Sequence, residues 1–377
     1  MSKILNKKII VISAVNLFEG GTLTILNTNL AFANDYLSVD YNIIVLVYKK
    51  SLFDLDKFSN ITFEEFPQSR SNYFVRLYLE YFHFHNLSKK WDPYLWFSLH
   101  DITPNVKAEI RAVYCHNPSP FKPKLISDLY FQPTLFFFSL FYKLLYQINI
   151  KKNDYVVVQQ IWLKNEFIKL FGLHKEKILV CYPESKKEVV SNKINSDSSL
   201  AKDKGIFTFF YPALARPFKN FEVIGEAISI LEKKGIINFQ VVITIKGDEN
   251  NYSKHIFKKY SKLKQLEFVG MLSFEKVKKI YVECDALLFP STLETWGLPI
   301  TEFKDYNKPV LLSKLPYAFE TLGDYDKGSF FDPSNAADLA QKMQLLMNGS
   351  LQFDITSITN ENVLIGWPEL YNKILAK

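Results

Sequence analysis

The sequence of 377 residues contains no run of about 20 uninterrupted apolar residues, so we expect no membrane-spanning helix. Its first apolar run, Ile9–Val15, follows lysines but has no cleavage-type site beside it, which favours a buried strand over a secretory leader. Cysteine is scarce as well. Cys115, Cys181 and Cys284 are odd in number and far apart, as expected for buried free thiols rather than a disulfide framework. These absences predict a cytoplasmic protein.

Signals for several ligand classes are also missing. The dinucleotide fingerprint Gly-x-Gly-x-x-Gly is absent, which argues against a nicotinamide enzyme. His83 and His85 alternate with phenylalanines, but no carboxylate or cysteine stands at a fitting spacing, so we predict no metal site. The net charge of +7 comes from scattered lysines, unlike the massed charge of a nucleic-acid binder. This charge fits anionic ligands or an anionic membrane surface.

The sequence does contain a long series of short apolar runs that alternate with helical stretches, the pattern of doubly wound α/β units. Because one core rarely serves a chain of this length, we expect two domains. We predict a Rossmann-like domain at 1–190, a polar linker at 191–204, a second Rossmann-like domain at 205–360, and a last helix at 361–377 that packs back on the first domain.

The apolar runs give specific expectations for strands and helices. In the first domain we expect strands at Ile9–Ser13, Ile43–Val47, Leu95–Leu99, Ala112–Cys115, Tyr155–Val158 and Ile178–Cys181, and a helix from Thr22 to about Leu37. In the second we expect strands at Ile206–Tyr211, Phe239–Ile245, Leu266–Val269, Ala286–Phe289 and Val310–Leu312. Its helices are expected at Phe221–Lys234, Tyr252–Leu263, Phe274–Glu283, Pro299–Asn307 and Asn335–Met347.

The stretch from Glu294 to Glu302 reads Glu-Thr-Trp-Gly-Leu-Pro-Ile-Thr-Glu and lies between two predicted strands. Pro299 suits the first turn of a helix, where the N–H has no partner. A strand, a glycine-bearing turn and a helix start bring backbone amides and the positive helix end to one sheet edge, where phosphate binds. The flanking carboxylates suit hydroxyl-rich groups such as ribose and a sugar, which together predict a nucleotide-sugar site.

Residues Phe121–Ile150 are unusually aromatic and have lysines around them. One interpretation is a long buried helix. The other is a surface that rests on anionic lipid at the inner face of the membrane. The lysines are Lys122, Lys124, Lys143, Lys151 and Lys152, and the aromatic residues that would extend the surface are Phe82, Phe84, Trp91, Tyr94 and Trp96.

Two longer segments resemble the motifs of a known family. Asp285–Glu302 and Tyr211–Asn220 resemble signatures of the retaining glycosyltransferases of family 4, and Phe268–Phe274 more loosely resembles the segment that lines their base pocket. The resemblance covers most of the chain and is strongest from about Phe207 to Pro333. It implies the GT-B fold, in which two Rossmann-like α/β domains face each other across a deep cleft.

The resemblance implies roles for charged residues of the second domain. Glu302 would bind the ribose hydroxyls, and Glu294 the hydroxyls of the donor sugar. Arg216 and Lys219 would neutralise the diphosphate as it departs. A basic turn of this kind is otherwise a solvated surface feature, and pairs of glutamates eight residues apart recur elsewhere in the chain.

It also implies which backbone groups meet the phosphates. These would be the amides of Trp296, Gly297 and Leu298 in the second domain and the glycine loop at Gly20 and Gly21 in the first. A double glycine alone is a common turn signal.

His116 ends a predicted strand and would touch the donor sugar or the acceptor near the reacting carbon. A lone histidine at such a place is otherwise more often a structural hydrogen-bonding group. His100 and Asp101 end another strand, and they could orient an acceptor hydroxyl.

These roles imply a metal-independent hexosyltransferase that moves a sugar from a UDP- or GDP-sugar to an acceptor hydroxyl, with retention of configuration and without a further cofactor. The expected partners are this donor and a saccharide or lipid-linked acceptor, as in cell-surface polysaccharide assembly, with no nucleic acid. A nucleotide-sugar epimerase, a phosphorylase and a catalytically silent binding protein of the same fold are the alternatives. The sequence has no motif for the pyridoxal phosphate lysine of a phosphorylase.

Overall fold

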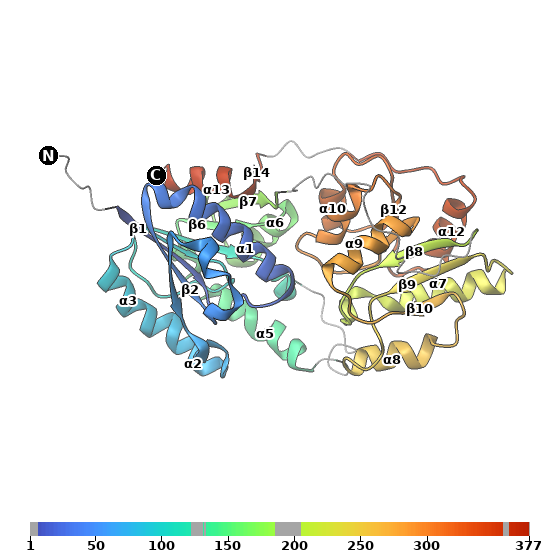
Figure 1. Ribbon diagram of the computed structural model, residues 1–377, viewed down its shortest axis with the longest axis horizontal. Coiled ribbons are helices and arrows are strands. Elements are labelled where there is room, and N and C mark those ends of the chain that lie inside the picture. The colour runs from blue at the N-terminus through green and yellow to red at the C-terminus, as the bar shows by residue number, and fades with distance from the viewer. Residues whose placement is uncertain (1–6, 122–130, 132, 185–204, 357–361, 377) are drawn as a thin grey trace. The chain divides into compact units, whose positions relative to one another are not determined.

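The computed structural model describes residues 7–121, 131, 133–184, 205–356 and 362–376 (Figure 1). The chain forms two compact α/β units. Unit 1 comprises Met1–Phe121, Ser139–Glu184 and Glu361–Lys377, and unit 2 comprises Lys122–Phe138 and Ser185–Asn360. The predicted linker at 191–204 lies outside the described residues.

Unit 1 is built on a parallel sheet with the strand order β14-β7-β6-β5-β4-β1-β2-β3. Every neighbouring pair in it is parallel, so all strands end at the same edge. The strands are β1 (Lys8–Ala14), β2 (Tyr41–Val47), β3 (Ile61–Glu65), β4 (Leu95–Ser98), β5 (Ile110–Cys115), β6 (Tyr155–Val158), β7 (Ile178–Tyr182) and β14 (Leu364–Ile365). The helices are α1 (Gly20–Asp35), α2 (Tyr73–Tyr78), the π-helix η5 (Leu79–His83), α3 (Phe84–Trp91), α5 (Pro133–Gln147), which belongs to this unit from Ser139 onward, α6 (Ile161–Phe171) and α13 (Gly366–Leu375).

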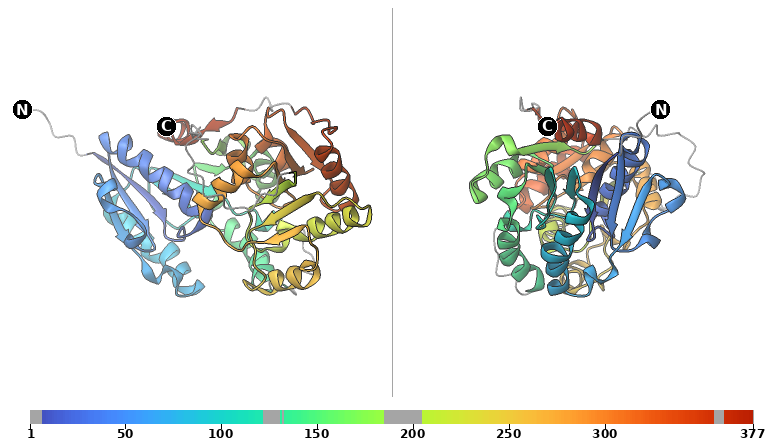
Figure 2. Two further views of the ribbon diagram at one scale, coloured as in Figure 1. Left: turned by 45° about the vertical axis from the view of Figure 1, so that its right-hand side comes forward. Right: turned by 90° about the vertical axis from the view of Figure 1, so that its left-hand side faces the viewer.

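The two faces of this sheet have separate apolar cores. On one face, alternate residues of β1 such as Ile10 and Ile12 pack with α1 and α13, and Asn29 of α1 donates a hydrogen bond to Tyr371 of α13 (Figure 1). On the other face, Val11 and its neighbours pack with η5 and α3 (Figure 2). This alternation follows from the two-residue period of a strand.

Unit 2 has its own parallel sheet, in the order β10-β9-β8-β11-β12-β13. Its strands are β8 (Phe207–Tyr211), β9 (Phe239–Ile243), β10 (Leu266–Phe268), β11 (Ala286–Phe289), β12 (Val310–Ser313) and β13 (Gly328–Phe331). Its helices are α7 (Phe221–Lys233), α8 (Asn251–Tyr260), α9 (Phe274–Glu283), α10 (Leu298–Lys304), α11 (Pro316–Leu322) and α12 (Ala336–Met347).

The helix ends follow local sequence signals. Asn250 and Ser273 accept hydrogen bonds from backbone amides in the first turns of α8 and α9, and Asn335 does so for α12. Prolines stand in the first turns of α10 and α11, where they remove no intrahelical hydrogen bond. These signals explain why the expected helix starts were nearly right.

The doubly wound α/β architecture is confirmed, together with every strand predicted from the apolar runs. Three strands were missed, β3, β13 and the short β14, and no bounds had been predicted for the helices α2, α3, α6 and α11. Two of the missed strands contain charged residues or glycine, which interrupt an apolar run: β3 contains Glu64 and Glu65, and β13 begins at Gly328. None of the helices in the described part of the chain is long and apolar enough to cross a membrane.

Candidate active site

In unit 2, two loops meet where β8 and β11 end. These strands are parallel neighbours, so the turn after β8, which includes the short helix η9 (Pro217–Lys219), lies beside the loop after β11. The Thr292 amide donates to the Phe218 carbonyl at 2.7 Å, and the Tyr211 hydroxyl donates to the Lys219 carbonyl at 2.9 Å. Segments more than 70 residues apart in sequence are therefore fastened together.

Lys219 and Glu294 form an ion pair across these two loops. Their side chains are only 17% and 14% exposed, and the Lys219 ammonium lies 5.6 Å from the centre of the Phe289 ring. The hydroxyls of Tyr211 and Tyr317 are buried nearby, and burial together with the negative charge of Glu294 raises the pKa of each. A charge pair with so little water around it interacts more strongly than one on the surface.

Gly297 follows Glu294 by three residues, and the Phe289 ring is a neighbour of both Gly297 and Lys219. The Gly297 φ of 84° is in the left-handed region, and a Cβ there would meet Ile300 at 3.1 Å and the Phe289 ring at 3.4 Å. Only glycine fits this turn without strain. The preceding Trp296 is buried, and the Thr321 hydroxyl donates to its carbonyl. The backbone at the start of α10 is therefore held in one conformation.

Glu302 follows Leu298 by one turn of α10, so the two side chains share a helix face. The Tyr281 hydroxyl donates to Glu302 Oε2 at 3.2 Å. Burial and, next, the charge of Glu302 raise the pKa of Tyr281. Arg216 is exposed at the residue before η9. The structure thus pairs Lys219 with Glu294, which precedes the turn at 296–298, places Glu302 one turn further on, and leaves Arg216 exposed.

The predicted residues of unit 1 also lie at a single sheet edge. Gly20 and Gly21 begin α1 just after β1, and Gly20 has a φ of 59°. His116 follows β5, and His100 with Asp101 follows β4. Since β1, β4 and β5 are parallel and adjacent, these residues share the carboxyl edge of the sheet.

Asp101 is the centre of the hydrogen bonding at this edge. Its carboxylate accepts from the backbone amides of His116 and Asn117 at 2.7 and 3.0 Å and from the Tyr146 hydroxyl at 2.7 Å. Asp101 is 4% exposed, and His116 Nε2 lies 3.7 Å from its carboxylate. Because the Asp101 carboxylate already accepts these hydrogen bonds from its own chain, it is better suited to holding the His116 loop than to orienting an acceptor hydroxyl.

Several residues that support the site were not predicted from the sequence. Tyr317 and Tyr146 look like ordinary core residues in the sequence, and only the fold brings them to Glu294 and Asp101. Asn220 stands inside the motif that resembles the family, and its amide donates to the carbonyls of Pro290 and Pro333. Asparagine adopts the left-handed conformation more readily than most residues, so a turn at Asn220 before α7, where its φ is 56°, could have been predicted.

The aromatic surface expected near residues 121–150 needs correction. Phe82 is 65% exposed, as expected, but Phe84, Tyr94 and Trp96 are buried. Phe84 and Trp96 face the core beneath α3, and Tyr94 packs into the core on the other face of the sheet. Lys143, Lys151 and Lys152 are exposed, whereas Lys122 and Lys124 lie outside the described residues.

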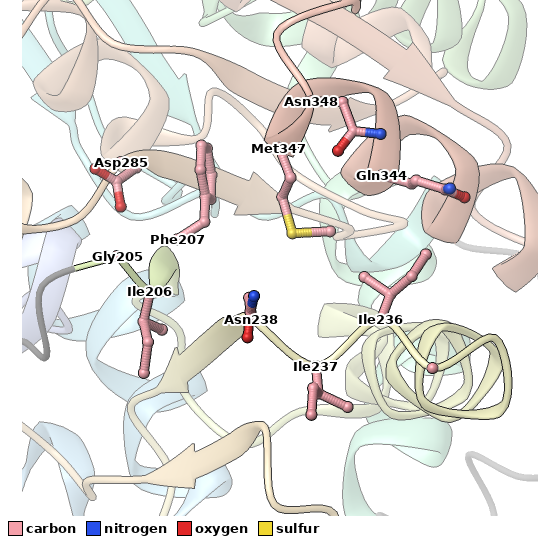
Figure 3. Close-up of a pocket in the computed structure, with 11 residues that line it drawn as sticks. Gly205, Ile206, Phe207, Ile236, Ile237, Asn238, Asp285, Gln344, Met347 and Asn348 are labelled. Atoms are coloured by element: carbon pink, nitrogen blue, oxygen red, sulfur yellow. The ribbon is translucent and has the colours of Figure 1, made fainter.

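A groove with a volume of about 610 Å³ lies at the opposite, amino edge of the unit 2 sheet (Figure 3). Phe207, Asn238 and Asp285, which begin or precede strands, line it together with Met347 at the end of α12. Its lining contains no lysine or arginine and none of the predicted site residues. It therefore lacks the cations that a diphosphate needs. Within the described residues, no group of three or more His, Cys, Asp or Glu side chains could hold a metal ion.

Comparisons with known proteins agree with this architecture. The family model "Glycosyl transferases group 1" matches residues 192–357. The O-antigen chain mannosyltransferase RfbU of Salmonella typhimurium is 22% identical over 196 residues, which are 51% of this chain and 51% of RfbU. The alignment spans about half the length of the curated relatives that the chain matches.

Solved structures match over nearly the whole chain. Sucrose-phosphate synthase from Thermosynechococcus elongatus has a TM-score of 0.69 at 14% identity, covering 91% of this chain and 90% of that one. HepE from Anabaena in complex with UDP-glucose has a TM-score of 0.57 at 15% identity, covering 91% and 89%. At such identities the likeness establishes the fold alone.

Proposed function

Because residues 192–357 match the family model "Glycosyl transferases group 1" and the chain has the GT-B fold, we propose that it transfers a sugar from a nucleoside-diphosphate sugar to an acceptor hydroxyl with retention of configuration. Unit 2 would bind the donor and unit 1 the acceptor. The proposal places the protein in family 4 and needs no metal ion.

The observation that carries this proposal is the shielded Lys219–Glu294 pair, whose glutamate stands three residues before Gly297. The Lys219 ammonium would stabilise the diphosphate, with Arg216 adding a second cation from the exposed side of the turn. Glu294 would accept hydrogen bonds from the donor sugar. The amides of 296–298 would donate to the phosphates, and Glu302, one turn further on, would bind the ribose.

In the proposed reaction, the bond between the anomeric carbon and the phosphate oxygen breaks, and the acceptor oxygen bonds to the same carbon on the same face. The acceptor proton passes to the departing phosphate oxygen. Neither glutamate needs to form a covalent bond, because positioning and charge stabilisation supply most of the rate. Gly20 and Gly21 would contribute backbone amides to the phosphates, and His116 would contact the sugar or the acceptor.

The relatives support a choice of substrates. RfbU is an O-antigen chain mannosyltransferase, and HepE was crystallised with UDP-glucose. We therefore propose a UDP- or GDP-hexose as donor and a saccharide or lipid-linked saccharide of the cell envelope as acceptor. The enzyme would act in the cytoplasm.

An exposed aromatic surface on unit 1 supports a membrane partner. On α2 and η5, Phe74, Tyr78 and Phe82 are 84%, 58% and 65% exposed. On α5 (Figure 1), Phe141 and Leu144 are 61% and 56% exposed. Lys143 stands between them. We propose that this surface rests on anionic lipid at the inner face of the membrane.

Cosedimentation with vesicles tests the membrane proposal. Replacing both Phe74 and Phe82 with serine should reduce binding to phosphatidylglycerol vesicles about thirtyfold or more, because each large aromatic side chain contributes on the order of 1 kcal/mol or more. Ile355→Ser, which changes a fully exposed apolar residue of unit 2, is the control. Equal binding by the unchanged protein, the variant with both phenylalanines replaced and Ile355→Ser would reject the proposed membrane surface.

The transferase proposal is tested by a donor screen. UDP-, GDP-, ADP- and dTDP-sugars would each be assayed for nucleotide release and for a rise in thermal midpoint. We expect one base to give both effects, and a product sugar of unchanged anomeric configuration with a saccharide acceptor. Isomerised sugar nucleotide without any acceptor would instead identify an epimerase, and the absence of binding by all four donors would end the proposal.

A further inference from the structure

We propose that Glu80 is a positioning residue for the reaction: it sets His100 and Asp101, and through them the loop that carries His116. This inference rests on the proposed function, because it gives His116 a role at the acceptor side. Glu80 is completely buried in the middle of a helical segment that otherwise looks like a surface feature.

The segment from α2 into η5 has two different faces. Phe74, Tyr78 and Phe82 repeat every four residues and point to solvent. Arg76 and Glu80 repeat with the same spacing, are 7% and 0% exposed, and point inward. The π-helical turn Leu79–His83 begins at this point. Such a turn inserts one residue into a helix and re-aims its side chains, often at functional sites.

Glu80 and the Ser13 carbonyl together fix the ring of His100, one at each ring nitrogen. His100 Nδ1 lies 2.9 Å from the Ser13 carbonyl, which only accepts, so this nitrogen carries a proton. His100 Nε2 lies 2.6 Å from Glu80 Oε1, within hydrogen-bond distance. Arg76 Nε lies 3.8 Å from the same carboxylate oxygen. The charged groups facing His100 are thus Glu80 and Arg76, both from one inner helix face.

Asp101, the residue after His100, connects the buried cluster to His116. Asp101 has a φ of 72°, a conformation that a non-glycine residue keeps only when its surroundings enforce it. Its amide donates to the Tyr114 carbonyl at 3.1 Å, and its carboxylate holds the amides of His116 and Asn117. A shift of His100 would therefore move the carboxylate on which the His116 loop hangs.

Stability alone does not explain this buried cluster. Burying a carboxylate, an imidazole and a guanidinium costs desolvation free energy that an apolar core of equal volume avoids. In the described part of the chain, His116 Nδ1 is buried and has no hydrogen-bond partner, so the fold does not consume that nitrogen. The cluster fixes the backbone of His116 and leaves Nδ1 of its ring without a partner.

The test is a double-mutant cycle. Glu80→Leu should lower kcat by about tenfold to a hundredfold, since small misplacements of a reacting group have effects of this size, and leave nucleotide affinity within about twofold. Glu80→Gln can still hydrogen-bond neutral His100 and should restore most of kcat. Glu109→Leu, an exposed glutamate of the same unit, is the matched control. In a His116→Ala background, Glu80→Leu should have no further effect on kcat.

Additive effects of Glu80→Leu and His116→Ala on kcat would overturn the proposal, as would equal losses from Glu80→Leu and Glu80→Gln. If Glu80→Leu does not fold, Asp101→Asn replaces it in the same cycle with the same expectation. A readout without activity separates this inference from the transferase proposal. The backbone amide resonances of His116 and Asn117 should shift in the Glu80 and Asp101 variants and not in Glu109→Leu. Unmoved resonances would refute the relay whatever reaction the protein catalyses.

Discussion

The two units end their parallel sheets in edges of different construction. In unit 2, the proposed donor groups come from two short segments, and the central contact is one ion pair, Lys219–Glu294. In unit 1, His116 is held through Asp101, which takes hydrogen bonds from loop backbone and from Tyr146 on α5. One edge uses charge at close range, whereas the other uses a network of backbone and hydroxyl groups.

This difference predicts how strongly a single substitution at each edge should reduce function. A single shielded charge pair should fail when one partner is removed, because the other is left buried and uncompensated. A network of several hydrogen bonds should lose function in smaller steps. The predictions below test the contrast in order of expected effect.

The largest effect is expected from Lys219→Ala. Loss of the cation should remove roughly 2–4 kcal/mol of transition-state stabilisation, so kcat should fall about thirtyfold to a thousandfold. Steady-state kinetics with the donor found in the screen measure it, with the exposed Lys254→Ala as control. Turnover equal to that of the unchanged protein would remove Lys219 from the mechanism.

Glu302→Ala should act on donor binding more than on turnover. A carboxylate that accepts from ribose hydroxyls contributes about 1.5–3 kcal/mol, so the Kd for the nucleotide should rise roughly tenfold or more. Titration calorimetry with the nucleoside diphosphate measures it directly. Tyr281→Phe, which removes the hydroxyl that donates to Glu302, should give a smaller change in the same direction. An unchanged Kd in Glu302→Ala would show that the ribose is bound elsewhere.

Gly297→Ala and Gly235→Ala make a matched pair. Both glycines have positive φ, 84° and 74°, so each substitution should cost about 1 kcal/mol of unfolding free energy through backbone strain. Only at Gly297 would the new methyl group meet Ile300 and Phe289, since open space surrounds Gly235. Nucleotide affinity should therefore fall in Gly297→Ala alone. Equal affinities in the two variants would separate this turn from the phosphate site.

The smallest effect is expected in unit 1. Tyr146→Phe keeps the ring and removes one of the hydrogen bonds to Asp101, which should cost about 1 kcal/mol of stability and change kcat only a few-fold. Thermal unfolding and steady-state kinetics measure both. A loss of kcat as large as that of Lys219→Ala would abolish the contrast drawn between the two edges.

The sequence predicted the two edges unequally for a physical reason. In unit 2, the loop after β11 and the start of α10 are adjacent in the chain, so Glu294, Gly297 and Glu302 appear as one readable motif. In unit 1, Glu80 precedes His100 by 20 residues, and Tyr146 follows Asp101 by 45. No local pattern announces such contacts.

The alternating α/β elements could be predicted from the sequence alone, since apolar periodicity and helix capping act within a few residues. The turn before α10, with Glu294 and Gly297, could also be predicted from the sequence. Only the tertiary structure decided that Glu80 faces inward while Phe74 and Phe82 on the same segment face solvent, and that Phe84, Tyr94 and Trp96 are buried. The reason is that burial depends on which sheet face and which neighbouring strands meet a side chain, and the crossovers that bring those strands together span tens of residues.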